Sequence, residues 1–170
     1  MKKLIALLLA VVLVLCLVAC GSGDKPAETE ATLKGEQKTW GQISVFVPEG
    51  YVLGGGSITG VDDTDETQCY IQPETPSMYD YYWICVQDAE TAAGNVEMTK
   101  NINYAEDITV NDGSKDWTGC HYVYESYSGS VDCGAVVCEI DGVTYVVNFC
   151  GHAPESAEMK TVLASVTAGK

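Results

Sequence analysis

Eight cysteines and two histidines are the most reactive side chains in this 170-residue sequence, and one pair of them is close in the chain. In Cys150-Gly151-His152, a continuing strand would place the thiol and the imidazole on the same side. A cysteine nucleophile needs a histidine base within hydrogen-bond reach and a third group that orients the base. The neighbouring residues supply no third group, so we expect no catalytic residue here.

Metal and cofactor sites have little support from residue spacing. Cys133, Cys138, Cys150 and His152 do not form a compact zinc knuckle, and a hairpin would divide them between two faces. The run Asp62-Asp63-Thr64-Asp65-Glu66 offers oxygen ligands to calcium, but it lacks the glycine and final glutamate of an EF-hand loop, which favours a solvated acidic loop. The sequence contains no Cys-x-x-Cys pair and no phosphate-binding glycine loop. We therefore expect no metal and no cofactor.

Counting along the predicted hairpins places the cysteines opposite one another. Asp141-Gly142 is a two-residue turn signal, and counting back from it puts Cys133 opposite Cys150. Treating Ser128-Gly129-Ser130 as a three-residue turn puts Cys120 opposite Cys138, with Tyr122 and Tyr124 on the same core-facing side as Val136. Cys69 and Cys85 flank the loop PETPSMYDYY and form a third candidate pair.

The pairs Cys69–Cys85, Cys120–Cys138 and Cys133–Cys150 are therefore candidate disulfides of an exported protein. Each would close a loop of about 15 to 20 residues and stabilise the fold by roughly 3 kcal/mol. A one-residue slip in register would invalidate this choice of partners. The alternative is that the six cysteines are reduced and pack as small buried hydrophobic residues.

Aromatic residues are concentrated in one stretch, with Met78, Tyr79, Tyr81, Tyr82 and Trp83 in or beside a long loop. Exposed tyrosine and tryptophan next to acidic residues are typical of surfaces that bind a protein or a glycan. This makes Tyr79, Tyr81, Tyr82 and Trp83 candidate binding residues. Strand alternation is an equal alternative, in which Tyr82 and Ile84 enter the core and the others stay half covered.

The elements that position these residues are predicted to be mostly strands. Alternating or β-branched runs predict strands over 42–47, 51–53, 69–72, 81–87, 119–127, 131–140 and 143–150. Asp88 is an N-cap signal for a helix over 88–101, which Gly94 weakens. Pro154, together with the spacing of Met159, Val162, Leu163 and Val166, predicts a C-terminal helix. The predicted fold class is α+β, a curved antiparallel sheet packed with helices.

The first residues have the pattern of an exported lipoprotein. Met1-Lys2-Lys3 is a cationic segment, and Leu4 to Val18 is an apolar run of secretory-signal length, short of the roughly 20 residues of a membrane span. Leu17-Val18-Ala19-Cys20 resembles the bacterial lipobox, which implies a signal peptide over 1–19 and a lipid on Cys20. The alternative is an uncleaved signal anchor. The lipobox predicts a domain held at the extracytoplasmic face of the cell membrane.

The rest of the chain divides into a tether and one domain. Residues 20–38 contain Leu33 as their one large aliphatic residue and are predicted to form a flexible linker, while 39–170 is long enough for a single core. Without Lys2 and Lys3, the chain has seven lysines against 24 acidic residues, a formal charge near −17. Such a charge repels nucleic acid and anionic lipid headgroups, so the membrane contact is assigned to the lipid.

The predicted domain is similar to a known fold. A first strand ending Phe46-Val47-Pro48-Glu49-Gly50-Tyr51, an antiparallel sheet, and a last helix with Val162-Leu163-Ala164-Ser165-Val166 together resemble the PsbP-like fold. The resemblance covers residues 40–168 and implies an α/β/α sandwich, a fold common among small bacterial lipoproteins. It implies no single function, because the fold hosts assembly factors and partner-binding proteins alike.

The sequence thus predicts a membrane-anchored extracytoplasmic lipoprotein that is a non-enzymatic binding or assembly module for a protein or glycan partner. The alternative is a small extracytoplasmic enzyme, or a thiol- or metal-dependent protein, that uses the region of Cys133, Cys150 and His152. The enzyme or thiol/metal hypothesis requires a free, titratable thiol or a bound metal, whereas the binding-module hypothesis requires neither.

Overall fold

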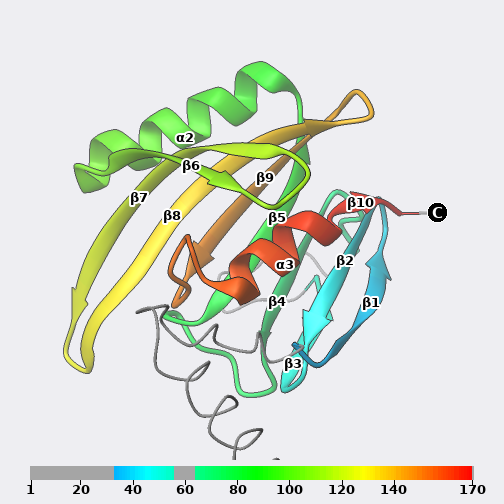
Figure 1. The fold of residues 1–170 in the computed structure, drawn as a ribbon, viewed down its shortest axis with the longest axis horizontal. Helices are drawn as coiled ribbons and strands as arrows, with labels where there is room; N and C mark the ends of the chain where they lie inside the picture. Colours follow the sequence, from blue (N-terminus) through cyan, green and yellow to red (C-terminus); the bar gives the residue numbers. More distant parts are fainter. Residues whose placement is uncertain (1–32, 56–63, 170) are drawn as a thin grey trace, which may run out of the picture. The chain divides into compact units, whose positions relative to one another are not determined.

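The computed structural model describes residues 33–55 and 64–169, and within these ranges the chain forms an α+β fold (Figure 1). The strands are β1 (Gly35–Trp40), β2 (Ile43–Pro48), β3 (Tyr51–Gly54), β4 (Gln68–Pro73), β5 (Tyr81–Gln87), β6 (Glu106–Asn111), β7 (Asp116–Ser126), β8 (Gly129–Ile140), β9 (Val143–Cys150) and β10 (Thr167–Ala168). The helices are α2 (Ala89–Asn103) and α3 (Ala157–Ser165). Neither helix of the described part has the length and hydrophobicity needed to cross a bilayer.

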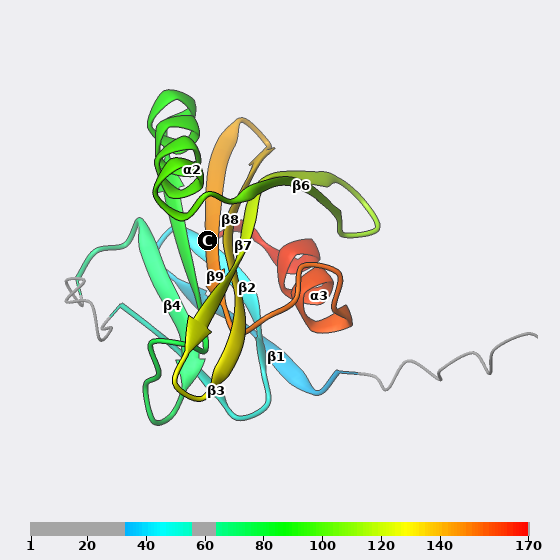
Figure 2. The same ribbon diagram turned by 90° about the vertical axis from the view of Figure 1, so that its left-hand side faces the viewer.

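Two antiparallel sheets form the framework of the described domain. The larger sheet has seven strands in the order β3-β4-β5-β9-β8-β7-β6, and the smaller has three in the order β1-β2-β10. Helix α2 packs on one face of the larger sheet, over β7, β8 and β9, while α3 lies on the other face and contacts β2 (Figure 2). The larger sheet is therefore the layer that positions side chains toward two different sides.

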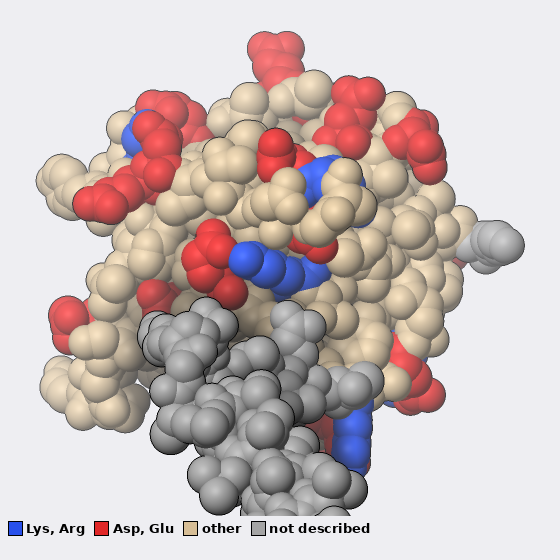
Figure 3. All heavy atoms as spheres, in the orientation of Figure 1, with Lys and Arg blue, Asp and Glu red and all other residues tan. Residues whose placement is uncertain are grey.

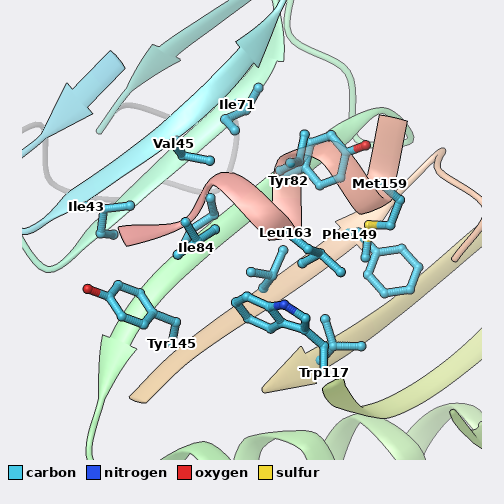
Figure 4. Packing of buried hydrophobic residues seen from close by; sticks show 14 of the residues in the cluster. Ile43, Val45, Ile71, Tyr82, Ile84, Trp117, Tyr145, Phe149, Met159 and Leu163 are labelled. Atoms are coloured by element: carbon cyan, nitrogen blue, oxygen red, sulfur yellow. The ribbon is translucent and has the colours of Figure 1, made fainter. Parts of the chain in front are cut away.

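The main core fills the space between the larger sheet, α3 and β2 (Figure 4). Its bulkiest members are at most 1% exposed and belong to one cluster with Met159 and Leu163 of α3: Trp117, Tyr82, Tyr145 and Phe149. Burying a large apolar side chain contributes about 1.5–3 kcal/mol, so these residues dominate the stability of this side. A smaller cluster of Ala105, Cys120 and Ala135 lies on the α2 side.

Both predicted helices are present, and side-chain caps determine where they begin. The Asp88 carboxylate accepts a hydrogen bond from the backbone N–H of Thr91 at 2.9 Å and caps α2, as predicted. The hydroxyl of Ser156 accepts one from the N–H of Met159 at 3.1 Å, so α3 begins after Ser156 and not at Pro154. The prediction of a helix start at Pro154 was therefore wrong by one turn.

The turn between β7 and β8 also differs from the prediction, and it changes which side chains face the core. Ser126 pairs with Gly129, so the loop has two residues instead of three. An odd shift in register moves every side chain of a strand to the opposite face. Tyr122 and Tyr124 consequently lie on the face opposite to Val136, contrary to prediction, while Trp117 occupies the core side of β7.

Three edge strands of the described part were not predicted: β1, β6 and the short β10, which pairs with β2. β1 begins at Gly35 and pairs with β2 over Gly35–Trp40, so the last four residues of the predicted tether belong to the domain. β6 pairs with β7 at the other edge of the larger sheet. Edge strands carry polar side chains and pair on one side only, so their composition resembles that of loops. The predicted signal peptide, Cys20 and the tether up to residue 32 lie outside the described residues.

Candidate functional site

Aromatic side chains gather on the face of the larger sheet that also carries α2. The strand register places Tyr81 opposite Cys150, Cys150 opposite Cys133, and Cys133 opposite Tyr122, which forms one row across β5, β9, β8 and β7. Side chains two residues apart on a strand share a face, so Trp83 and Tyr124 extend this row. We define the tyrosine face as Tyr79, Tyr81, Trp83, Tyr122 and Tyr124.

The rings of the tyrosine face hold one another in place. Tyr79 stacks on Tyr124 with ring centroids 5.7 Å apart, and Trp83 stacks on the buried Tyr70 at 5.7 Å with an interplanar angle of 1°. Partial burial, followed by the nearby Tyr122 and Tyr70, raises the pKa of Tyr81. The hydrogen bond of the Tyr79 hydroxyl with Tyr124 is the main cause of a raised pKa of Tyr79. The hydroxyls of Tyr79 and Tyr81 are therefore neutral at physiological pH.

The exposure of these aromatic residues decides between the two sequence interpretations. Tyr82 is fully buried against α3, on the face opposite to Tyr81, so it cannot be a binding-surface residue. Tyr79, Tyr81 and Trp83 stay half-buried, as the alternation hypothesis predicted. Tyr124 is 44% exposed, and neither it nor Tyr122 was singled out from the sequence as a binding residue. Correct counting of the β7–β8 turn would have added both.

A disulfide lies at the centre of the tyrosine face. Cys133 and Cys150 are joined, as the Asp141-Gly142 register predicted, and their Cα atoms are 4.1 Å apart. The bridge spans 17 positions of sequence and contributes about 3 kcal/mol in the chain-entropy model. Because both sulfur atoms are covalently paired, neither is a nucleophile or a zinc ligand in this state, so the Cys133/Cys150/His152 site has no free thiol.

The other two predicted disulfides are absent, and Cys69, Cys85, Cys120 and Cys138 are free thiols. In the β4–β5 ladder Cys69 lies opposite Ile84, and Cys85 lies opposite Gln68, so the two cysteines are offset by one residue. Their thiols are therefore on opposite faces of the sheet. Cys120 lies opposite Ala135, and three positions separate Ala135 from Cys138, which again places the thiols on opposite faces. Burial raises the pKa of Cys85 to about 12 and also raises that of Cys138. These thiols are therefore protonated packing groups.

On the opposite side of the larger sheet, His152 is the centre of a polar cluster. Its Nδ1 atom is 3.2 Å from Oε1 of Glu158 and its Nε2 atom is 3.2 Å from Oδ1 of Asp80. The imidazole is 7% exposed and stacks on the ring of Tyr82, with centroids 4.0 Å apart. The Tyr51 hydroxyl donates to Asp80 at 2.7 Å, and the Tyr82 hydroxyl donates to Glu158 at 3.1 Å. We call these five residues the histidine clasp.

The electrostatics of the clasp follow from burial and from hydrogen bonds. The hydrogen bond to His152 is the main cause that holds the pKa of Glu158 below its usual range, and a hydrogen bond from Tyr82 adds to it. Desolvation, followed by the neighbouring carboxylates, raises the pKa of both Tyr51 and Tyr82 well above the usual tyrosine value. The clasp thus combines the ionised carboxylate of Glu158, the carboxyl group of Asp80, two neutral phenols and one histidine. The sequence did not indicate it, since its members come from four separate segments.

No group of three or more His, Cys, Asp or Glu side chains is arranged to hold a metal ion within 33–55 and 64–169. Of the acidic run considered for calcium, Asp62 and Asp63 lie outside the described residues. The Asp65 carboxylate accepts hydrogen bonds from the backbone N–H and the hydroxyl of Thr67, at 2.9 and 2.6 Å. Asp65 is therefore a turn-capping residue.

An open groove of about 410 Å³ lies beside β1 and β2. It is lined by residues 34–36, Lys38 and residues 47–51, which include Tyr51 of the histidine clasp. Its two lysines, Lys34 and Lys38, each pair with a glutamate, at 3.9 and 2.8 Å. The groove therefore offers no unpaired cation to an anionic ligand.

Comparison with known proteins shows the fold alone. No protein-family model and no curated protein matches the chain. A crystal structure from Bacteroides thetaiotaomicron VPI-5482 has a similar fold, with a TM-score of 0.51 and 12% sequence identity over 81% of this chain and 50% of that one. This chain therefore spans half the length of that protein. The similarity carries no activity or partner to this chain.

Proposed function

We propose that this chain is a membrane-anchored extracytoplasmic lipoprotein whose domain binds a partner protein through the tyrosine face. The observation that carries the proposal is the cluster of partly exposed rings around the Cys133–Cys150 disulfide. Tyrosine and tryptophan provide a large contact area with few rotatable bonds, and they are enriched at the energetic centres of protein interfaces.

The tyrosine face is already ordered before a partner arrives. Tyr81 and Tyr122 flank a disulfide in a four-strand row, and stacking on Tyr70 and Tyr124 restrains Trp83 and Tyr79. Association costs free energy for each side chain that must be immobilised. A surface whose rings are fixed in advance loses less entropy and binds more tightly for the same contact area.

The charge of the domain selects a basic partner. The sequence carries 24 acidic residues and nine lysines, two of them in the signal segment. Figure 3 illustrates this overall charge on the α3 side, opposite to the tyrosine face, where acidic side chains are spread over the surface and lysines are few. Complementary charge accelerates association, and tyrosine and tryptophan rings attract lysine and arginine cations. We therefore infer a partner segment rich in lysine, arginine and aromatic residues.

The lipid anchor and the PsbP-like fold are two further parts of the proposal, the first supported by the sequence and the second by the arrangement of the sheet and helices. The lipobox at Leu17-Val18-Ala19-Cys20 supports cleavage before Cys20 and lipid attachment there. An antiparallel sheet with α2 and α3 on opposite faces supports assignment to the PsbP-like sandwich. If Cys20 carries the lipid, Cys20→Ala moves the chain from the membrane fraction to the soluble fraction of the producing cells. Retention of Cys20→Ala in the membrane supports an uncleaved anchor instead.

The binding proposal is tested with the chain from residue 21 onward and an array of peptides that vary in lysine, arginine and aromatic content. Tyr81→Ala combined with Tyr124→Ala is expected to weaken binding at least about tenfold, since truncated interface aromatics commonly cost more than 1 kcal/mol each. Met98→Ala is the control, because Met98 is 55% exposed on α2 outside the tyrosine face. Equal loss in both variants, or binding of uncharged glycans in place of peptides, contradicts a basic protein partner.

A further inference from the structure

The position of His152 between two acidic residues raises the question of its charge. The imidazole is 7% exposed, so the neighbouring groups and not bulk water compensate any charge it carries. These groups are Tyr51 from β3, Asp80 directly before β5, Tyr82 from β5 and Glu158 from α3. No lysine is among them.

A count of protons decides which form of His152 fits. Tyr51 and Tyr82 already donate their hydroxyl protons to Asp80 and Glu158, and an ionised carboxylate is an acceptor only. A neutral imidazole has one N–H and one lone pair, so one ring nitrogen would present its lone pair to a carboxylate oxygen 3.2 Å away. Both carboxylates face an N–H group only when His152 is an imidazolium.

The two arms of the clasp are unequal. The Nδ1 arm is a hydrogen bond to Glu158, whereas Nε2 is buried and has no aligned hydrogen-bond partner among the described residues, although Asp80 is at ion-pair distance. The Asp80 arm is thus held by charge attraction alone. When His152 loses the proton on Nε2, the hydrogen bond between Nδ1 and Glu158 stays in place. The Nε2 lone pair then faces the Asp80 carboxylate, and the attraction between His152 and Asp80 becomes a repulsion.

The Asp80 arm is connected to the tyrosine face through one residue. Asp80 follows Tyr79, whose ring stacks on Tyr124. Gly151, the residue before His152, has a φ of +88° and packs directly against the backbone of Tyr79 and Asp80. A Cβ atom at Gly151 would be 2.5 Å from the Tyr79 carbonyl oxygen. Movement of Asp80 away from His152 therefore moves Tyr79 as well.

We propose that His152 is a proton-operated latch, in which the imidazolium holds the Tyr79–Asp80 segment against the end of β9 and proton release frees it. Imidazolium is the acid form of histidine, so the latch is closed in acid and opens as pH rises. The latch is a property of the free domain. Its consequence, that Tyr79 leaves the tyrosine face and partner binding weakens as pH rises, rests on the proposed function.

Amide hydrogen exchange of the unliganded chain from residue 21 onward tests the latch. After correction for intrinsic exchange rates, the protection of the amides of 79–81 is expected to fall about fivefold from pH 5 to pH 8, the factor that corresponds to the loss of one partly exposed ion pair. His152→Gln is expected to show low protection at both pH values. His121→Gln is the matched control, because His121 pairs with Asp132 at 2.7 Å and is no part of the clasp. It is expected to retain the wild-type pH response.

A second variant keeps the test decisive if His152→Gln does not fold. Asp80→Asn retains the imidazole and Glu158 but removes the charge that the latch needs, so its protection is expected to be low and independent of pH. A wild-type chain without a pH response, or the same response in either variant, overturns the latch. Peptide binding measured at both pH values separates the two proposals: a pH response in exchange without any peptide binding contradicts the proposed function and leaves the latch intact.

Discussion

Replacing Asp112 with asparagine is expected to destabilise the domain by about 2–3 kcal/mol. The Asp112 side chain is fully buried and accepts hydrogen bonds from the backbone N–H groups of Ser114 and Lys115, at 2.8 and 2.9 Å, and from Nε1 of Trp117 at 2.9 Å. An asparagine presents an NH₂ group to one side, so the indole or the two backbone donors lose their acceptor. Each buried donor without a partner costs about 1–3 kcal/mol.

The same substitution has a pH signature. Burial raises the pKa of Asp112, but hydrogen bonds from Trp117, Lys115 and Ser114 outweigh burial and hold the pKa well below its usual range. A carboxyl group with a lowered folded-state pKa stabilises the fold above its unfolded pKa of about 3.9, and this contribution is lost as pH falls toward the folded value. The free energy of unfolding of wild type therefore exceeds that of Asp112→Asn by the full amount at pH 7, and this difference is expected to decrease below about pH 4.

Urea unfolding, followed by tryptophan fluorescence at pH 7 and pH 3, measures both effects. Asp116→Asn is the control, because Asp116 is exposed on the same turn and accepts a hydrogen bond from Asn111 at 2.7 Å. Its expected cost is under about 0.5 kcal/mol. A cost for Asp112→Asn within that limit, or a difference that stays constant between pH 7 and pH 3, refutes the reasoning.

Three further predictions concern the thiols, the sheet and α3. Alkylation of the denatured chain from residue 21 onward, without reduction, is expected to label Cys69, Cys85, Cys120 and Cys138. Reduction is expected to expose Cys133 and Cys150 as well, and a peptide map with another disulfide contradicts the strand register. Gly134→Ala is expected to lower the free energy of unfolding by more than about 2 kcal/mol, since a Cβ atom there would be 2.6 Å from the Phe149 ring. Gly94→Ala is the control, because Gly94 has open space around it and alanine stabilises a helix by about 0.5–1 kcal/mol relative to glycine. Equal effects of the two substitutions in thermal unfolding would show that the contact with Phe149 is absent. Glu158→Gln is expected to lower the free energy of unfolding at pH 7, and this loss is expected to shrink progressively as pH falls below the unfolded glutamate pKa of about 4.3, because the pKa of Glu158 is lowered in the folded state. A loss that stays constant in acid points to a steric cause.

Much of the fold was predictable from local signals. Asp141-Gly142 fixed the β8–β9 register and, with it, the Cys133–Cys150 disulfide, because a two-residue turn leaves one way to pair the strands. Asp88 marked the start of α2, and the spacing of Met159, Val162 and Leu163 identified the apolar side of α3.

The β7–β8 turn shows why the rest was not predictable. The sequence around Gly129 is compatible with a two-residue turn at Tyr127-Ser128 or with a three-residue turn at residues 128–130. The choice depends on burial of Trp117, a contact across the whole core. The polar edge strand β1 is recognisable only through its partner β2. The histidine clasp is a tertiary arrangement of Tyr51, Asp80, Tyr82, His152 and Glu158, which no spacing reveals.

The central claim is that the tyrosine face is the binding surface, and NMR detection of the aromatic rings tests it most directly. The basic peptide that binds most tightly in the array is titrated into the chain from residue 21 onward. We expect the largest shift changes at the rings of Tyr79, Tyr81, Trp83 and Tyr124, with the methyl signal of Met98 unchanged. Changes centred on α2 or on the groove beside β1 and β2, with the tyrosine rings unmoved, would contradict the account.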